Sequence, residues 1–120
     1  MKNKIRIILS EKAKTTGEIR YSEILKMVGL SITKKNQDYL QSILIAIGRE
    51  EYAAGRPLIN GLVINDTKRP GIGFFYEYKN LTKRNFLISD IKKQKEIHAS
   101  IKRECSEYYS KDCPATGGES

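Results

Sequence analysis

The segment 58–78 limits the possible folds of this chain more than any other stretch, because it combines two strand-like patterns with a chain reversal. Residues 58–65 are apolar and rich in β-branched side chains, and residues 74–78 carry an aromatic side chain at every second position. Between them, Pro70 fixes φ and Gly71 is free to adopt a positive φ, which is typical of a turn. We therefore expect a β-hairpin with a basic tip over this segment.

Three segments ahead of the hairpin have the apolar spacing of amphipathic helices. The first spans residues 3–14, and the second spans 21–30, where Gly29 is placed to end the helix. The third, 36–54, is the clearest, because its apolar residues recur at three- and four-residue steps until Gly55 stops it. These patterns predict a helical unit before the hairpin.

A further apolar pattern follows the hairpin. From residue 86 to 109 apolar side chains recur at alternating three- and four-residue steps, which predicts a C-terminal helix that docks on the domain or on a second copy. The short segment 18–20 is expected to pair with the hairpin. The prediction is an α+β fold, a winged helix-turn-helix of three helices plus a β-hairpin wing, with an added C-terminal helix. We expect a winged-helix domain over 1–80, this helix over 81–110 and a flexible tail over 111–120.

Composition indicates the kind of partner. The chain has 120 residues, of which 22 are Lys or Arg and 14 are Asp or Glu, so its formal net charge is +8. The positive excess is concentrated in residues 1–36 and 79–120. A basic protein favours polyanionic partners such as nucleic acid or an acidic protein surface. Two cysteines, no apparent export signal and no membrane-length apolar window predict a cytoplasmic protein with reduced thiols that does not bind a membrane.

The turn before the third predicted helix has residue types suited to binding DNA. In helix-turn-helix proteins this end of the helix enters a groove. Lysines neutralise phosphates, Asn and Gln can hydrogen-bond adenine edges, and a helix N-terminus attracts phosphate. The same residue types are also ordinary in a solvated capping turn. The candidates at this turn are Thr33, Lys34, Lys35, Asn36 and Gln37.

Two further groups of candidates lie outside this turn. Lys68 and Arg69 occupy the expected hairpin tip, where they would contact a flanking backbone or the minor groove, although most tips are polar in any case. Ser22 begins the second predicted helix, where it could cap the helix and contact a phosphate. Tyr21 beside it is as well explained by packing at the edge of the core.

The order of these elements and three of their strings resemble a small winged-helix module of bacterial and phage proteins associated with restriction and DNA defence. The strings are Tyr-Ser-Glu-Ile at 21–24, Arg-Pro-Leu-Ile at 56–59 and Arg-Pro-Gly-Ile-Gly-Phe-Phe at 69–75. The layout over 18–78 is also similar to the DNA-binding domain of alkyltransferase and alkyltransferase-like repair proteins. The resemblance implies DNA binding by the turn, the third helix and the wing. The reactive Pro-Cys-His-Arg string of alkyltransferases is missing, so alkyl transfer is not implied.

Residues for catalysis or metal binding are few. His98 is the single histidine, and we expect it to be solvated or at an interface. Glu50 and Glu51 are adjacent on a helix, so their carboxylates diverge. Cys105 and Cys113 have no further cysteine or histidine partners at zinc-ligand spacing. We therefore expect no enzyme activity, no metal and no cofactor.

The function that these observations favour is non-catalytic binding of double-stranded DNA. Such a protein would act as a transcription regulator or as the DNA-reading component of a phage or bacterial defence system. The alternative is a protein–protein interaction module, for example a phage-encoded inhibitor of a host or defence protein. A homodimer through the C-terminal helix is compatible with either function.

Overall fold

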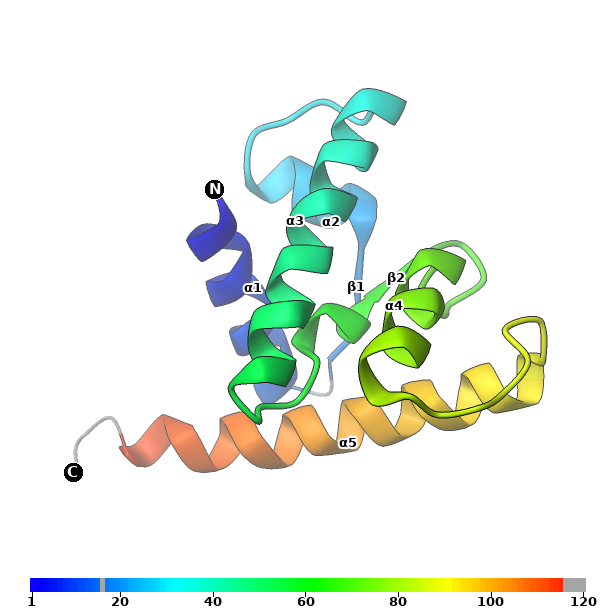
Figure 1. The fold of residues 1–120 in the computed structure, drawn as a ribbon. Helices are drawn as coiled ribbons and strands as arrows, with labels where there is room; N and C mark the ends of the chain where they lie inside the picture. Colours follow the sequence, from blue (N-terminus) through cyan, green and yellow to red (C-terminus); the bar gives the residue numbers. More distant parts are fainter. Residues whose placement is uncertain (16, 116–120) are drawn as a thin grey trace.

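The computed structural model describes residues 1–15 and 17–115, with side chains up to residue 110. The helices α1, α2 and α3 form the body of the molecule, α4 lies beside α3, and the long α5 runs across the base (Figure 1). The elements are α1 (Lys2–Lys14), β1 (Ile19–Arg20), α2 (Tyr21–Met27), α3 (Lys34–Ala53), the short 3-10 helix η1 (Ile59–Leu62), β2 (Val63–Ile64), α4 (Ile72–Thr82) and α5 (Ile91–Ala115).

The three predicted N-terminal helices are confirmed in position. Gly29 and Gly55 follow α2 and α3 with φ angles of 79° and 74°, a backbone conformation that favours glycine. Each belongs to a Schellman motif, in which the next residue donates its N–H back into the helix, from Leu30 to Leu25 over 2.8 Å and from Arg56 to Glu51 over 2.9 Å. The two glycines therefore end the helices as the sequence predicts.

The predicted β-hairpin is wrong. Residues 59–62 form η1, and the two residues of β2 pair in parallel with β1, so that Ile19 lies opposite Val63. The second half of the segment is the helix α4, which begins after Gly71. The described residues are thus mostly helical with one small two-stranded parallel sheet, and the fold is not a winged helix. The predicted pairing of 18–20 with the later segment holds for β1.

The aromatic residues of α4 explain why the sequence pattern over 74–78 predicted a strand instead of a helix. Phe74, Phe75 and Tyr78 are buried, whereas Tyr76 is exposed. A buried set at positions i, i+1 and i+4 is one face of a helix. Over five residues the alternation of aromatic side chains also fits a strand, and length is what separates the two interpretations. The helix continues to Thr82, beyond the part that alternates.

The predicted C-terminal helix is confirmed as an element that docks on the rest of the chain. α5 packs against α1 and η1, and its buried stripe includes Ile97, Ile101, Cys105 and Tyr109. It begins at Ile91 rather than near residue 86 and continues through Ala115 into the expected tail. Residues 116–120 lie outside the described residues. A homodimer through α5 stays a prediction and would need its outer face.

A buried carboxylate ties the carboxyl end of α3 to two other helices. Glu51 is fully buried and forms an ion pair with Arg6 of α1. Arg56 donates from Nε to its Oε2 over 2.6 Å, and the Tyr109 hydroxyl of α5 lies 3.4 Å from the same oxygen. Because this end of α3 is fixed against α1 and α5, the opposite end extends away from the base (Figure 1).

Candidate nucleic-acid interface

The first turn of α3 is held by its own side chains. Thr33 is the N-cap, and its Oγ1 accepts the N–H of Asn36 over 3.1 Å. The side-chain amide of Asn36 donates to the carbonyl oxygen of Ser31 over 2.7 Å. Thr33 and Asn36 therefore shape the turn, and Asn36 would have to break this bond to present both polar atoms to a base. Sequence analysis identified both residues as candidates for DNA contact, whereas their contacts here are structural.

Among the described residues, two other candidates at this end of α3 make no such structural hydrogen bonds. Lys35 and Gln37 are exposed, and neither makes a side-chain hydrogen bond or ion pair within the described part of the chain. Lys34 is also exposed, but its Nζ lies 3.5 Å from both carboxylate oxygens of Asp38 one turn later. Lys35 and Gln37 are thus the side chains of this end that could contact a partner without losing an internal interaction.

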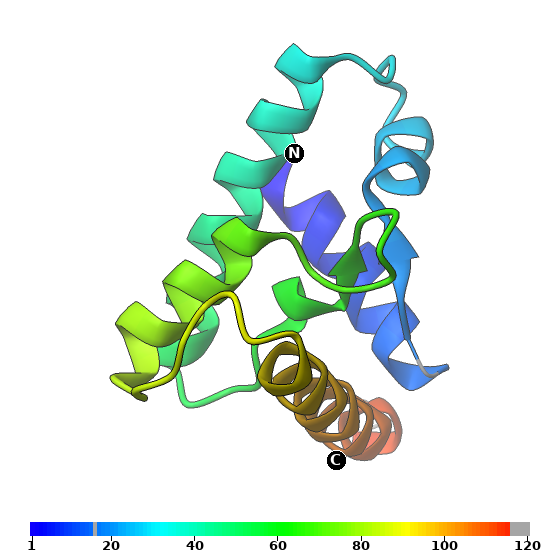
Figure 2. The same ribbon diagram turned by 90° about the vertical axis from the view of Figure 1, so that its right-hand side faces the viewer.

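A surface pocket joins the starts of α2 and α3 to the loop that follows β2. Its volume is about 270 Å³, and both Ser22 and Gln37 line it. Figure 2 shows the loop beside α2 and below the amino end of α3. Ser22 lies inside α2, whose N-cap is Arg20, so its expected capping role is wrong. The other residues that line this α2–α3 pocket are Arg20, Tyr21, Ile32, Ile64, Asn65 and Asp66.

The charges around the α2–α3 pocket nearly cancel. Arg20 pairs with Asp66 over 3.3 Å, as Lys34 pairs with Asp38. Tyr21 donates its hydroxyl to Gln41 Oε1 over 2.9 Å, and burial raises its pKa, so it is a neutral packing residue at the edge of the core. This end of the molecule therefore offers shape and hydrogen-bonding groups more than net positive charge.

Lys68 and Arg69 lie in the loop between β2 and α4, not at a hairpin tip. Asn65 Oδ1 accepts the N–H of Thr67 over 2.9 Å, which starts the turn. Lys68 follows with a φ of 63° and an exposed side chain. Arg69 is half-buried and donates from Nε to Gln94 Oε1 of α5 over 3.2 Å. The hydrogen bond of Arg69 thereby links the loop to α5, whereas the side chain of Lys68 points into solvent.

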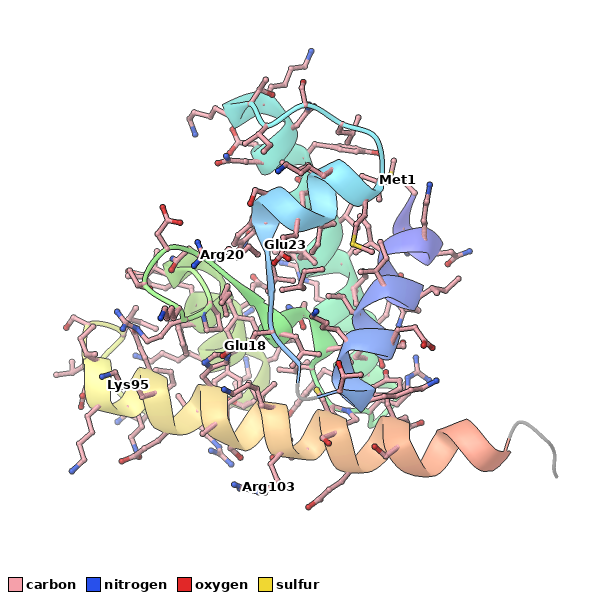
Figure 3. The ribbon with its side chains drawn as sticks, turned by 180° about the vertical axis from the view of Figure 1, so that it is seen from behind. Met1, Glu18, Arg20, Glu23, Lys95 and Arg103 are labelled. Atoms are coloured by element: carbon pink, nitrogen blue, oxygen red, sulfur yellow. The ribbon has the colours of Figure 1, made fainter. Side chains whose placement is uncertain are left out.

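A second pocket brings this loop together with one face of α5, and we call it the basic pocket. Its volume is about 390 Å³. It is lined by Glu18, by residues 67–69 and by Lys95, His98, Ala99 and Lys102 of α5. Figure 3 shows Glu18 and Lys95 on the same side of the molecule. Sequence analysis missed Lys95 and Lys102, although their seven-residue separation indicates a shared helical face.

The Cys105 thiol and the His98 imidazole are both buried, and their surroundings shift their pKa values. Burial raises the pKa of the Cys105 thiol to about 12, so the group is protonated at neutral pH. His98 is buried, contrary to the expected solvated or interface position, and burial followed by the nearby Lys102 lowers its pKa. Among the described residues no three His, Cys, Asp or Glu side chains gather as metal ligands would. None of the helices that are described is long and apolar enough to span a membrane.

Known proteins give no further guide to this site. No family model, curated protein or solved structure matches the chain. The DNA binding implied by the resemblance to winged-helix modules stays a prediction, and it now concerns a helical protein without a wing.

Proposed function

We propose that this protein binds double-stranded DNA and catalyses no reaction on it. The observation that carries the proposal is the α2–α3 pocket, in which Ser22 of α2, Gln37 of α3 and the loop after β2 share one surface. The same loop continues into the basic pocket through Lys68 and Arg69. Residues that are far apart in the sequence thus form one polar face, flanked on one side by an excess of positive charge.

The two parts of this face would contact DNA differently. The exposed amino end of α3 would enter a groove, with Gln37 contacting base edges and Lys35 a phosphate. The loop would lie along a flanking strand, where Lys68 and Arg69 neutralise phosphates. With Lys34 included, about four phosphate contacts form, and the logarithm of the binding constant should fall with the logarithm of the salt concentration with a slope of roughly −3 to −4.

The biological role proposed with this activity is that of a transcription regulator or a DNA-reading component of a phage or bacterial defence system. This role rests on the resemblance of the strings at 21–24, 56–59 and 69–75 alone, since the structure does not share the winged-helix layout. The α2–α3 pocket supports duplex binding as such, whichever process it serves.

A protein partner is the second candidate, and one observation favours it. Ile72 and Tyr76 lie one turn apart on α4, and both are more than half exposed, at 57% and 60%. An apolar pair on a helix surface is a common contact for another protein. A phage-encoded inhibitor would bind its target through such a surface.

Fluorescence anisotropy with a labelled blunt duplex that ends in 5′-hydroxyl groups tests the proposal. Titrations at about 50 and about 200 mM salt give the salt slope. The paired variant Lys35→Ala/Lys68→Ala should reduce the magnitude of the slope by about 2, since each lysine contributes about one phosphate contact. The matched control is Lys4→Ala/Arg103→Ala, which removes the same charge from exposed positions on α1 and α5.

Three results would reject duplex binding by this face. One is no binding at the lower salt concentration. Another is equal weakening by both paired variants, because binding would then depend on net charge alone. The third is that the protein shows no duplex affinity and instead forms a one-to-one complex with a host protein. That complex would survive both paired variants and be lost in Tyr76→Ala.

A further inference from the structure

The basic pocket contains more positive charge than its own acids can neutralise. Four cationic side chains line it, namely Lys68, Arg69, Lys95 and Lys102, against the single carboxylate of Glu18. This carboxylate lies inside the group, with its Oε2 2.9 Å from Lys102 Nζ. The pocket therefore holds an internal anion and still has an excess of three positive charges.

A buried histidine at this pocket lacks a hydrogen-bond partner. His98 is 4% exposed, and its Nε2 makes no hydrogen bond to any described residue. Glu18 Oε2 is 3.4 Å from this nitrogen, but the geometry is not that of a hydrogen bond. A buried polar atom without a partner is costly, and a ligand or ion that completes the site is one explanation for it.

We propose that the basic pocket is a binding site for a phosphate monoester, which replaces the Glu18 carboxylate as the acceptor for Lys102 and also accepts a hydrogen bond from His98. A phosphate monoester carries a charge near −2 at neutral pH and three acceptor oxygens. Lysine ammonium groups and the arginine fork are the usual partners of such oxygens. The charge of a phosphate monoester and its number of acceptor oxygens match this pocket, whose lining also includes the unpaired imidazole nitrogen of His98.

The volume of the pocket and its excess positive charge favour a terminal phosphate over one within a nucleic-acid strand. About 390 Å³ is at the small end of the range for ligand pockets and is suited to a mononucleotide. A phosphate inside a strand carries one charge and is flanked by sugars on both sides, so it matches the three excess positive charges and the 4% exposed His98 less well than a terminal phosphate does. The site therefore accepts a free nucleotide or the phosphorylated end of a strand, and it does not depend on duplex binding by the face described above.

The carboxylate of Glu18 competes with an incoming phosphate for the same cations. Its side chain is 31% exposed, so the carboxylate can turn outward into water when a phosphate enters. Removing its charge should therefore strengthen binding, because the ligand then displaces a neutral amide instead of an ion-paired carboxylate. Replacement of a cation that contacts the phosphate should have the opposite effect.

Titration of the full chain with adenosine 5′-monophosphate and with inorganic phosphate, followed by amide NMR, tests the site. At ionic strength matched with sodium chloride, the amides of Thr67, Lys68 and Ala99 should shift. Lys95→Ala and Lys102→Ala should each weaken binding about tenfold or more, as expected for a lost charged hydrogen bond. Glu18→Gln should tighten it severalfold, and Lys4→Ala on α1 should leave it unchanged. Lys95 is exposed, so its variant keeps the fold.

A second pair of titrations distinguishes the two sources of the phosphate. A short single strand with a 5′-phosphate is compared with the same strand ending in a 5′-hydroxyl. Binding that requires the terminal phosphate and is lost in Lys102→Ala assigns the pocket to strand ends, whereas binding of the mononucleotide alone assigns it to free nucleotides.

Two results would overturn the assignment. One is that none of the phosphate probes shifts these amides beyond the effect of sodium chloride. The other is that Lys4→Ala weakens binding as much as Lys102→Ala does. The blunt 5′-hydroxyl duplex used above carries no terminal phosphate, so the failure of one proposal does not entail the failure of the other.

Discussion

The two ends of α3 show how one helix serves two purposes. At its carboxyl end Glu51 is buried and paired with Arg6 and Arg56, so that α1, α3 and α5 meet at one point. At its amino end Lys35 and Gln37 are exposed and bound to nothing in the described structure. The difference teaches that the buried ion pairs position the helix, whereas side chains at the opposite end are not needed for internal contacts. Substitutions at the carboxyl end should therefore change stability, and those at the amino end should change binding.

The largest effect on stability is expected for Glu51→Ala. Two arginines and a tyrosine hydroxyl lose their shared acceptor inside the protein, and breaking a buried ion pair in this way costs about 3–5 kcal/mol. Urea denaturation measures the loss in the free energy of unfolding. The neighbouring Glu50 is exposed and pairs with Lys2 and with Arg6, which keeps Glu51 as a partner. Glu50→Ala is the control and should destabilise far less, because exposed ion pairs contribute little to stability. Similar losses for the two variants would remove the contrast between buried and exposed charge.

Gly48→Ala should come next, because it fills space that a buried side chain already occupies. A Cβ at residue 48 would lie 2.6 Å from the Asn60 amide nitrogen. Overpacking of this kind costs about 1–3 kcal/mol, which exceeds the roughly 1 kcal/mol that alanine adds to a helix. Thermal unfolding followed by circular dichroism measures it. Gly73→Ala in α4 is the control, since its nearest neighbour is the flexible end of Gln41. Stabilisation by Gly48→Ala would show that the carboxyl half of α3 is looser than described.

Thr33→Ala tests the amino end as a structural element. Loss of the cap bond to the Asn36 N–H should cost about 1 kcal/mol. Thr33→Ser keeps a hydroxyl acceptor and should behave as the original chain in the same urea titration. A loss as large as that of Glu51→Ala would mean that the two ends contribute equally to stability.

The smallest effect on stability is expected for Lys35→Ala, which tests whether the amino end of α3 affects binding without affecting stability. Its side chain is exposed and unpaired within the described residues, so the free energy of unfolding should not change measurably. Its effect should instead appear in duplex binding, where the salt slope should become shallower by about 1. Gln37→Ala should leave the slope unchanged and reduce discrimination between sequences. A Lys35→Ala protein that is destabilised but binds normally would reverse the assignment of this end.

The success of the sequence analysis varied with the length of each pattern. α1, α3 and α5 repeat their apolar spacing over several turns, and the shorter α2 is marked by Gly29 at its end, so the positions of these helices were predictable. The segment 74–78 is too short for periodicity to separate a strand from a helix, and the hairpin was wrong for that reason. Of the candidate site residues, Ser22 and Gln37 are brought together in one pocket, and Lys68 and Arg69 in another.

The sequence by itself determined the approximate positions of α1, α2, α3 and α5 and the excess positive charge of the chain, because these properties depend on residues close together along the chain. Only the tertiary structure decided that Lys95 and Lys102 face Lys68, that Glu18 lies among them and that Glu51 is buried between two arginines. Apart from the pair Glu51–Arg56, these contacts join residues dozens of positions apart, and no local spacing specifies them. The physical reason is that packing of α5 against α1 and η1, through apolar side chains, places these charges as a consequence.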